Sequence, residues 1–566
     1  MKKKFNILYS VLIAMASAFV SCTDIMDETP NAGYDKDKYF DSVEKAEMAV
    51  MGVYNSISDY RHYGWYEMAL HGSDDTYFAS RQTTDNQIND ISHYRMSSTN
   101  EWIETLWMLK YQGIDRANVA IEGMQNMKRP SVEEDAHRLT SLLAEARFLR
   151  AMLAFDLVRY WGDVPYKTIP TGSFEEAFGE RVNRDKIYDL IVEDLNFAKN
   201  NLDWATETSN TERVTQGAAR ALLMRVYLQR AGYSLQMDGT MTRPDNATRE
   251  KYFEAVITEW QAFAENGYHD LHPVGYEELF RGFSAEVANS KESLFEIALY
   301  HSTGNRNGSA WGIYIGPQVA EPTGIPASET SKYMARANGF FFVVPEWYEF
   351  FEDTDVRRDI NICTHRWIWN ATEKKHIAEE RKNTGWYVGK WRREWMTEED
   401  RGKNMNYADV NFCVIRFADV LLMAAEAYNE MGNTADAIEL INKVRTRAGA
   451  TAFSLSNYDR IYKARGMYDL PFIDDSDNQG QIRVALYWER GFELAFEGQR
   501  KYDLLRWGIL ADALKLFGEN SVVNKNGRTL YPGPLNFVKG KHELLPVPLA
   551  ELQSNLKLEG KNNPGY

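Results

Sequence analysis

The sequence predicts a mostly α-helical protein whose scaffold is a helical repeat. Residues 145–160 place apolar side chains at helical spacing over several turns, and Gly162 and Pro165 then supply a stop. Residues 417–448 contain two such stretches joined at a glycine. In a tetratricopeptide helix pair, small residues and a turn glycine occupy set positions. The residues at the corresponding positions here are Ala425, Tyr428, Gly432 and Ala437.

Two further segments repeat this arrangement. Residues 220–232 are a weaker instance, in which Tyr227 and Gly232 have the same relation, and residues 488–507 are a third. Each helix pair leaves an apolar face uncovered, so several pairs must stack into one array. The alternative is an irregular helical bundle.

Residues 488–507, WERGFELAFEGQRKYDLLRW, predict two helices hinged at Gly498. Three arginines stand beside carboxylates in this run: Arg490, Arg500 and Arg506. Arginine forms planar, two-pronged pairs with carboxylates, which favours pairing at a partly buried helix junction. The alternative is a charged hairpin with no special role.

Helical patterns cover about 41–58, 102–265 and 411–515, and the first of these helices begins beside Asp41 and Ser42 as candidate N-caps. Between them, residues 60–100 and 266–410 mix aromatic, glycine and polar residues without a helical period. We therefore expect one domain, 41–566, with two irregular regions. Binding residues concentrate on such loops when a rigid scaffold carries them.

The first residues have the pattern of an exported protein. Lys2 to Lys4 precede an apolar run from Ile7 to Val20, which predicts a signal peptide over 1–21. Cys22 directly after Ser21 is similar to a bacterial lipoprotein signal, in which the cysteine is lipidated; the alternative is an incidental cysteine. Residues 22–40 are then a lipid-anchored tether.

Composition excludes some classes of partner and leaves others open. The net charge of −16 argues against nucleic acid, because binding phosphates requires a basic surface. Aromatic residues make up 13% of the chain, including 15 Trp and 32 Tyr, so some of them should lie near the surface. Such rings suit the faces of sugars and also protein interfaces.

Four runs and the lipoprotein-like start together resemble the SusD/RagB family. The runs are residues 144–165, 415–430, 488–507 and the ending 543–566, and they follow the order of that family. The resemblance implies about four tetratricopeptide-like units beside an irregular ligand-binding face. It also implies a lipid-anchored, surface-exposed glycan-binding protein of an outer membrane.

The resemblance further implies a partner, a SusC-like TonB-dependent transporter that receives the captured oligosaccharide. It implies a scaffold role, and no ligand contact, for the charged residues inside the matching motifs. These are Arg147, Asp156, Arg416, Asp419, Glu426, Arg490, Glu493 and Arg500.

No motif in the chain indicates catalysis or a cofactor. HExxH, GxSxG and Walker sequences are absent. Asp475 to Gly480 begins like a calcium loop, but the twelfth position is Leu486 instead of the bidentate glutamate, so a solvated acidic turn is the better interpretation. We therefore expect a non-enzyme without cofactor.

For the ligand site the sequence offers aromatic and polar residues of the irregular regions. In one group rings would stack on sugars while charged groups bond hydroxyls: Trp65, Tyr66 and Tyr77 with Asp74, Asp75 and Arg81. A second group, Trp311 and Tyr314, lies on a glycine-rich loop. The alternative for each ring is packing beneath a loop.

Three other functions remain open at this point. The same fold would capture peptides if the site were an extended groove offering backbone-like hydrogen bonds. A surface glycosidase needs only two carboxylates at a set separation, which a sequence does not give. An intracellular adaptor is disfavoured by residues 1–22.

Overall fold

The computed structural model describes six segments of the chain. These are residues 39–79, 87–301, 308–403, 406–463, 469–519 and 531–566. The predicted signal peptide, Cys22 and Arg81 lie outside the described residues.

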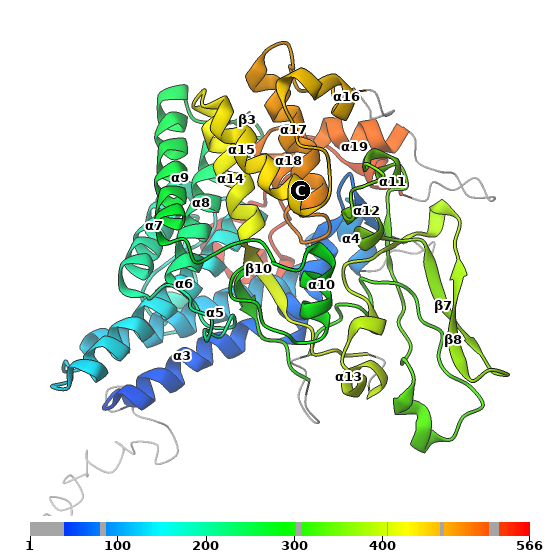
Figure 1. Ribbon diagram of the computed structural model, residues 1–566. Helices are drawn as coiled ribbons and strands as arrows, with labels where there is room; N and C mark the ends of the chain where they lie inside the picture. The colour runs from blue at the N-terminus through cyan, green and yellow to red at the C-terminus, as the bar shows by residue number, and fades with distance from the viewer. Residues whose placement is uncertain (1–38, 80–86, 302–307, 404–405, 464–468, 520–530) are drawn as a thin grey trace, which may run out of the picture.

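Long helices form the scaffold, as predicted. They are α3 (Val43–Ile57), α5 (Glu101–Asn126), α6 (Glu133–Trp161), α7 (Arg184–Asn201), α8 (Gln216–Ala231), α9 (Asn246–Asn266), α14 (Phe417–Glu430), α15 (Thr434–Arg447), α17 (Asn478–Glu493), α18 (Arg500–Arg506) and α19 (Leu510–Glu519). Helix α6 packs against α5 and α7, α8 against α7 and α9, and α14 against α9, α15 and α17. Figure 1 shows α7, α8, α9, α14 and α15 stacked side by side.

Capping residues fix where these helices begin and end. The Ser42 side chain accepts a hydrogen bond from Lys45 N at the start of α3, and α6 ends at Gly162 with φ of 73°. Gly432, with φ of 82°, makes the turn between α14 and α15. The helix pair predicted over 417–448 is therefore confirmed.

Shorter elements occupy the intervening segments. The short helices are α4 (Gln87–Ser92), α10 (Tyr276–Ser284), α11 (Trp347–Phe350), α12 (Arg357–Asn361), α13 (Glu398–Lys403), α16 (Tyr458–Tyr462), α20 (Gly533–Asn536) and α21 (Leu549–Ser554). The single-turn helices are η2 (Tyr60–Gly64), η3 (Tyr66–His71), η4 (Glu175–Ala177), η5 (Ala327–Lys332), η6 (Asn383–Gly385), η7 (Arg393–Trp395), η8 (Leu455–Asn457) and η9 (Leu556–Leu558). In the described segments, no helix combines the length and apolar character that crossing a membrane requires.

The strands are few and short. A four-stranded sheet has the order β1 (Thr76–Phe78), β5 (Phe341–Val343), β9 (Tyr387–Val388), β6 (Ile362–Cys363). Three antiparallel pairs are β4 (Ser293–Ile297) with β10 (Phe412–Arg416), β2 (Ser234–Leu235) with β3 (Met241–Thr242), and β7 (His365–Asn370) with β8 (Lys375–Glu380). The β7–β8 hairpin projects at one side of the molecule (Figure 1).

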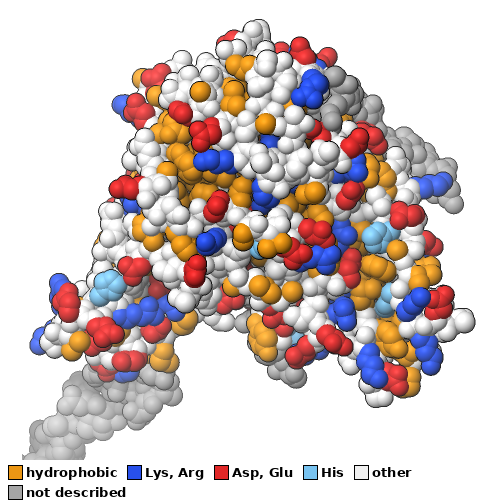
Figure 2. All heavy atoms as spheres, in the orientation of Figure 1, with side chains coloured by type: hydrophobic (Ala, Val, Ile, Leu, Met, Phe, Trp, Pro, Cys, Tyr) orange, Lys and Arg blue, Asp and Glu red, His pale blue; other side chains and the backbone are white. Residues whose placement is uncertain are grey.

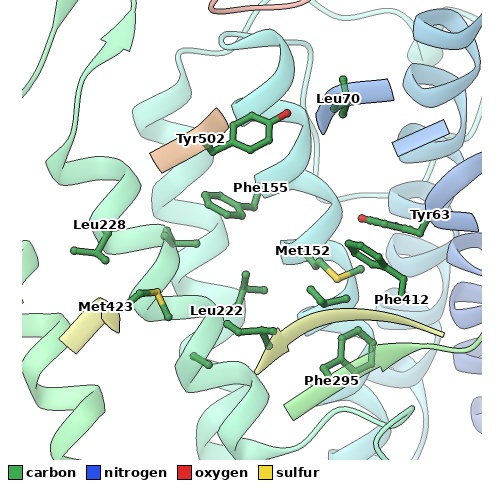
Figure 3. Packing of buried hydrophobic residues seen from close by; sticks show 14 of the residues in the cluster. Tyr63, Leu70, Met152, Phe155, Leu222, Leu228, Phe295, Phe412, Met423 and Tyr502 are labelled. Atoms are coloured by element: carbon green, nitrogen blue, oxygen red, sulfur yellow. The ribbon is translucent and has the colours of Figure 1, made fainter. Parts of the chain in front are cut away.

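One hydrophobic core joins the scaffold to the irregular segments. It extends along the chain from Ala46 to Leu558. Figure 3 shows side chains of α6, α8 and the β4–β10 pair meeting there: Met152, Phe155, Leu222, Phe295 and Phe412. The short strands thus pack directly on the helices. The loops attached to these strands are therefore anchored on a close-packed core.

Buried ion pairs hold α17 and α18 to their neighbours. Arg490 contacts Asp419 and Asp503, each at 2.8 Å, and Arg506 forms a two-pronged pair with Glu426. The turn between the two helices passes through Gly498, whose φ is 82°. The predicted hinge and the pairing at a buried helix junction are therefore confirmed.

A second buried network lies beside the first. Arg416 contacts Glu292 at 3.0 Å and Glu493 at 2.6 Å. Burial raises the pKa of the Glu493 carboxyl, but Arg447, Arg416 and Arg357 together hold it below its usual value. Glu493 therefore stays charged and paired in the interior.

Candidate ligand-binding surface

Six rings from distant parts of the chain form what we call the aromatic surface cluster: five are linked by direct ring contacts, and the sixth, Tyr407, joins them through the buried Tyr60. Its members are Trp65, Tyr66, Trp102, Tyr314, Phe340 and Tyr407. Tyr314 is mostly buried, and the other five are partly exposed. The cluster brings together three residues predicted as ligand contacts, Trp65, Tyr66 and Tyr314.

Trp65 lies at the centre of this cluster. Its ring centroid is 4.8 Å from that of Tyr314 and 5.0 Å from that of Trp102. Tyr66 stacks on Trp102 at 4.0 Å with an angle of 8° between the rings. Stacked and tilted rings hold one another in place, so the exposed edges and faces are preorganised.

Local backbone features set the positions of these rings. The Asn100 side chain caps α5 by accepting from the backbone N–H groups of Trp102 and Ile103, which fixes Trp102 in the first helical turn. The Asp59 side chain caps η2 in the same way, and Trp65 follows as the last residue of that turn. Both ring-bearing backbones are therefore anchored.

Polar groups border the rings. The guanidinium of Arg336, an exposed side chain, donates to Asn338 Oδ1 at 3.0 and 3.1 Å. The indole Nε1 of Trp65 is itself buried and has no hydrogen-bond partner in the part of the chain that the structure describes, so the polar edge consists of the neighbouring side chains. Burial raises the pKa of the Tyr314 hydroxyl, which therefore stays protonated and able to donate.

The prediction that Asp74 bonds a ligand at the surface is wrong. Asp74 is fully buried, and both of its oxygens accept from Arg500, at 2.8 and 2.7 Å. Tyr487 donates to the same carboxylate at 2.7 Å. The guanidinium of α18 therefore draws this loop carboxylate into the core.

Asp75 is also buried, and its two oxygens have no hydrogen-bond partner among the described residues. Burial, and then the neighbouring charge of Asp74, raise the pKa of the Asp75 carboxyl to about 7. The predicted contact between Asp75 and sugar hydroxyls is therefore contradicted, because this carboxyl, like that of Asp74, does not reach the surface.

Two predicted stacking rings also lie in the interior. Tyr77 stacks on Tyr531 at 4.9 Å, and Trp311 has no exposed surface. Trp311 stacks on Phe412 at 5.3 Å and donates its indole N–H to the Tyr63 carbonyl. Its glycine neighbours allow close packing, because a Cβ on Gly316 would lie 2.5 Å from the Trp391 carbonyl. The glycines thus serve a buried turn instead of presenting a ring.

Three members of the cluster were missed by sequence reasoning. Trp102 begins the helical stretch predicted over 102–265, Phe340 lies inside the irregular region 266–410, and Tyr407 lies far from Trp65 in sequence. The Asn100 cap was a usable signal for Trp102, because a ring in a first helical turn often faces the preceding loop. Nothing in the sequence joins Tyr407 to Trp65.

In the described residues we find no metal site, and the face drawn in Figure 2 has no charged patch that is as well defined as the aromatic surface cluster. Among the described residues, no group of three or more His, Cys, Asp or Glu side chains is placed to hold a metal ion. The calcium-like segment has other contacts: Asp475 accepts from Tyr458 at 2.6 Å, and Asp477 caps α17. On the face drawn in Figure 2, acidic and basic side chains are interspersed.

Comparison with protein families identifies matches over most of the chain. The model of the SusD family matches residues 291–566. A model described as "starch-binding associating with outer membrane" matches residues 24–228.

Full-length relatives give the same picture. SusD-like protein P2 of Formosa agariphila is 27% identical over 577 residues, which cover 100% of each chain. A SusD homologue from Bacteroides thetaiotaomicron has a TM-score of 0.76 and 26% identity, over 94% of this chain and 98% of its own. A laminarin-binding SusD-like protein has a TM-score of 0.64 and 25% identity, over 93% and 100%.

Proposed function

We propose that this chain, which belongs to the SusD/RagB family, captures oligosaccharides at the outer membrane on its aromatic surface cluster. The observation that carries the proposal is the group of interlocked, partly exposed rings around Trp65, bordered by Arg336 and Asn338. Sugar C–H faces stack on such rings, while side chains bond the hydroxyls. The laminarin binding of one structural relative supports a glycan as the ligand.

The protein would bind without altering its ligand and would pass it to a SusC-like TonB-dependent transporter. Lipidation of Cys22 would hold it at the cell surface through the tether 22–40. An open surface with few stacking rings gives weak binding, which suits a protein that must release its ligand to a partner. We expect dissociation constants of roughly micromolar to millimolar.

Affinity electrophoresis on a panel of polysaccharides tests the ligand. We expect at least one glycan to retard the protein, and Trp65→Ala to weaken that retardation by about fivefold or more, since stacking contributes roughly 1 kcal/mol. Trp369→Ala is a matched control, because Trp369 is also a half-buried indole but lies on the β7–β8 hairpin. Equal retardation of the wild type and the Trp65 variant would show that the site lies elsewhere.

Two assays separate capture from its alternatives. Release of reducing sugar in proportion to protein concentration would make the protein a glycosidase and refute a purely binding role. Binding of a peptide library with no binding of any glycan would favour peptide capture. For the partner, we expect the TonB-dependent transporter to copurify from outer membranes, and Cys22→Ala to release the protein from them.

A further inference from the structure

A cleft with a volume of about 1210 Å³ lies apart from the aromatic surface cluster. Its walls are one face of α5, the segment 165–183 and the C-terminal segment around α21. None of the six cluster residues lines it. Ligand pockets for small molecules usually enclose roughly 300–1,000 Å³, so this cleft has room for an extended ligand.

The cleft is preformed, because hydrogen bonds tie its irregular wall to helices on both sides. Asn118 Nδ2 on α5 donates to the carbonyls of Lys167 and Ile169, at 3.2 and 3.0 Å. From the C-terminal wall, Asn555 Nδ2 donates to the Gly179 carbonyl and Lys557 Nζ to the Phe178 carbonyl, at 2.9 and 2.8 Å. A ligand would therefore find the walls already in place.

Aromatic rings line the interior of the cleft. Tyr111, Tyr166 and Phe178 are half-buried, and Trp107 lies beneath them. The Tyr111 hydroxyl donates to the Pro165 carbonyl at 2.6 Å, which fixes the ring against the irregular wall. Three partly exposed rings therefore line the cleft, and one of them is held by a hydrogen bond to the opposite wall.

Polar side chains with unused bonding capacity line the same cleft. Glu104 and Gln112 lie on α5 at spacings of four residues from Met108, so all three share one helix face. Lys186 contributes from the start of α7. Among the described residues, the side chains of Glu104, Gln112 and Lys186 have no hydrogen-bond or ion-pair partner, and all three are exposed. A carboxylate, an amide and an ammonium group together offer both donors and acceptors.

We propose that this cleft is a second oligosaccharide-binding site of the same chain. Rings with flat exposed surface match sugar faces, and separated donors and acceptors match hydroxyl groups that point in different directions. The proposal rests on the proposed glycan-binding function but adds a site to it. Two sites would let one chain hold a polysaccharide at two points, so that each weak contact benefits from the other.

Titration calorimetry of the mature, lipidated protein in detergent tests the number of sites. The probes are maltohexaose, laminarihexaose and mannohexaose, three soluble oligosaccharides of defined length. With the probe that binds, we expect two sites for each chain. Phe178→Ala should weaken one of them by about fivefold or more, and Trp65→Ala should weaken the other.

Two further variants guard against misfolding and misassignment. Ala550→Trp places a large ring in the cleft from an exposed position on α21, and it should abolish the same site that Phe178→Ala weakens. Trp369→Ala is again the matched control, because Trp369 lies on the β7–β8 hairpin and does not line the cleft. Unchanged thermal unfolding of all three variants shows that the fold is intact.

The outcomes separate this inference from the proposed function. One site for each chain, lost in Trp65→Ala and unaffected by Ala550→Trp, overturns the second site and leaves the proposed function standing. Loss of the copurified transporter in Ala550→Trp, with sugar binding unchanged, makes the cleft a protein-docking surface and also overturns it. Absence of binding by all three probes counts against both proposals.

Discussion

Trp65 and Asp74 lie close together in one irregular stretch, yet the structure gives them opposite environments. Trp65 is partly exposed among rings, whereas Asp74 is fully buried against Arg500, which is 426 residues away in sequence. Both residues have types that suit a sugar. The difference shows that a loop in this protein supplies contacts to the surface and also completes the interior of the helical scaffold.

The interior partner decides which of these roles a residue takes. Asp74 meets a guanidinium and a tyrosine hydroxyl from α17 and α18, and leaving that guanidinium unpaired in the core would be costly. Trp65 packs against other rings, and part of its surface stays exposed. The two regions should therefore respond differently to mutation: one in stability, the other in binding.

The largest expected effect is on the buried pair. Arg500→Ala leaves Asp74 charged and unpaired in the interior, and we expect it to lower the free energy of unfolding by roughly 3–5 kcal/mol. Urea unfolding measures this loss. Arg281→Ala breaks an exposed pair with Glu277 on α10 and should cost about 0.5 kcal/mol or less. Similar losses in both variants would contradict the assignment of Asp74 to the core.

Trp311 sharpens the comparison among the rings. Trp311→Ala empties a fully buried site and should cost roughly 3–5 kcal/mol of stability. Glycan affinity of the protein that remains folded should be unchanged, because the ring does not reach the surface. A selective loss of glycan binding at unchanged stability would return Trp311 to the ligand site.

Asp75 makes the buried region sensitive to pH. Its pKa is raised from 3.8 to about 7 in the folded protein, so the folded state keeps this proton while the unfolded state loses it. Stability should therefore fall as the pH rises from about 4 to about 7, and stay level above that. This decline amounts to up to about 4 kcal/mol of the free energy of unfolding. It should be absent in Asp75→Asn, which has no carboxyl to ionise at this position.

Urea unfolding of the wild type and the Asp75→Asn variant at pH 4, 6 and 8 measures this effect. The stability of the variant relative to the wild type should grow with pH over that range. Asp353→Asn is a control, because the Asp353 side chain is 98% exposed, and its stability relative to the wild type should not grow in this way. A constant difference between wild type and Asp75→Asn would show that the Asp75 carboxyl is not protonated in the folded state at pH 6.

The sequence predicted the scaffold well because its signals are local. The period of α6, the turn at Gly432 and the hinge at Gly498 each depend on residues that are near neighbours in the chain. The pairing of Arg490, Arg500 and Arg506 with carboxylates was also foreseen, since arginines on an apolar helix must find partners.

The aromatic surface cluster was only partly predictable because its members meet through the tertiary fold. Trp65, Tyr66 and Tyr314 were identified by residue type, but residue type alone also selected Tyr77 and Trp311, which are buried. Whether a ring is exposed depends on what packs over it, and for Trp311 this is Phe412 on β10. No local pattern around residue 311 carries that information.

The smallest expected effect is at the edge of the aromatic surface cluster. Arg336 is exposed, and among the residues that the structure describes its guanidinium donates only to Asn338 Oδ1. Arg336→Ala should weaken glycan binding by about two- to threefold, less than Trp65→Ala, since a solvent-exposed hydrogen bond contributes roughly 0.5 kcal/mol. Stability should change by less than about 0.5 kcal/mol. Affinity electrophoresis beside Trp65→Ala measures the difference, and equal losses would place the polar edge, and not the rings, at the centre of recognition.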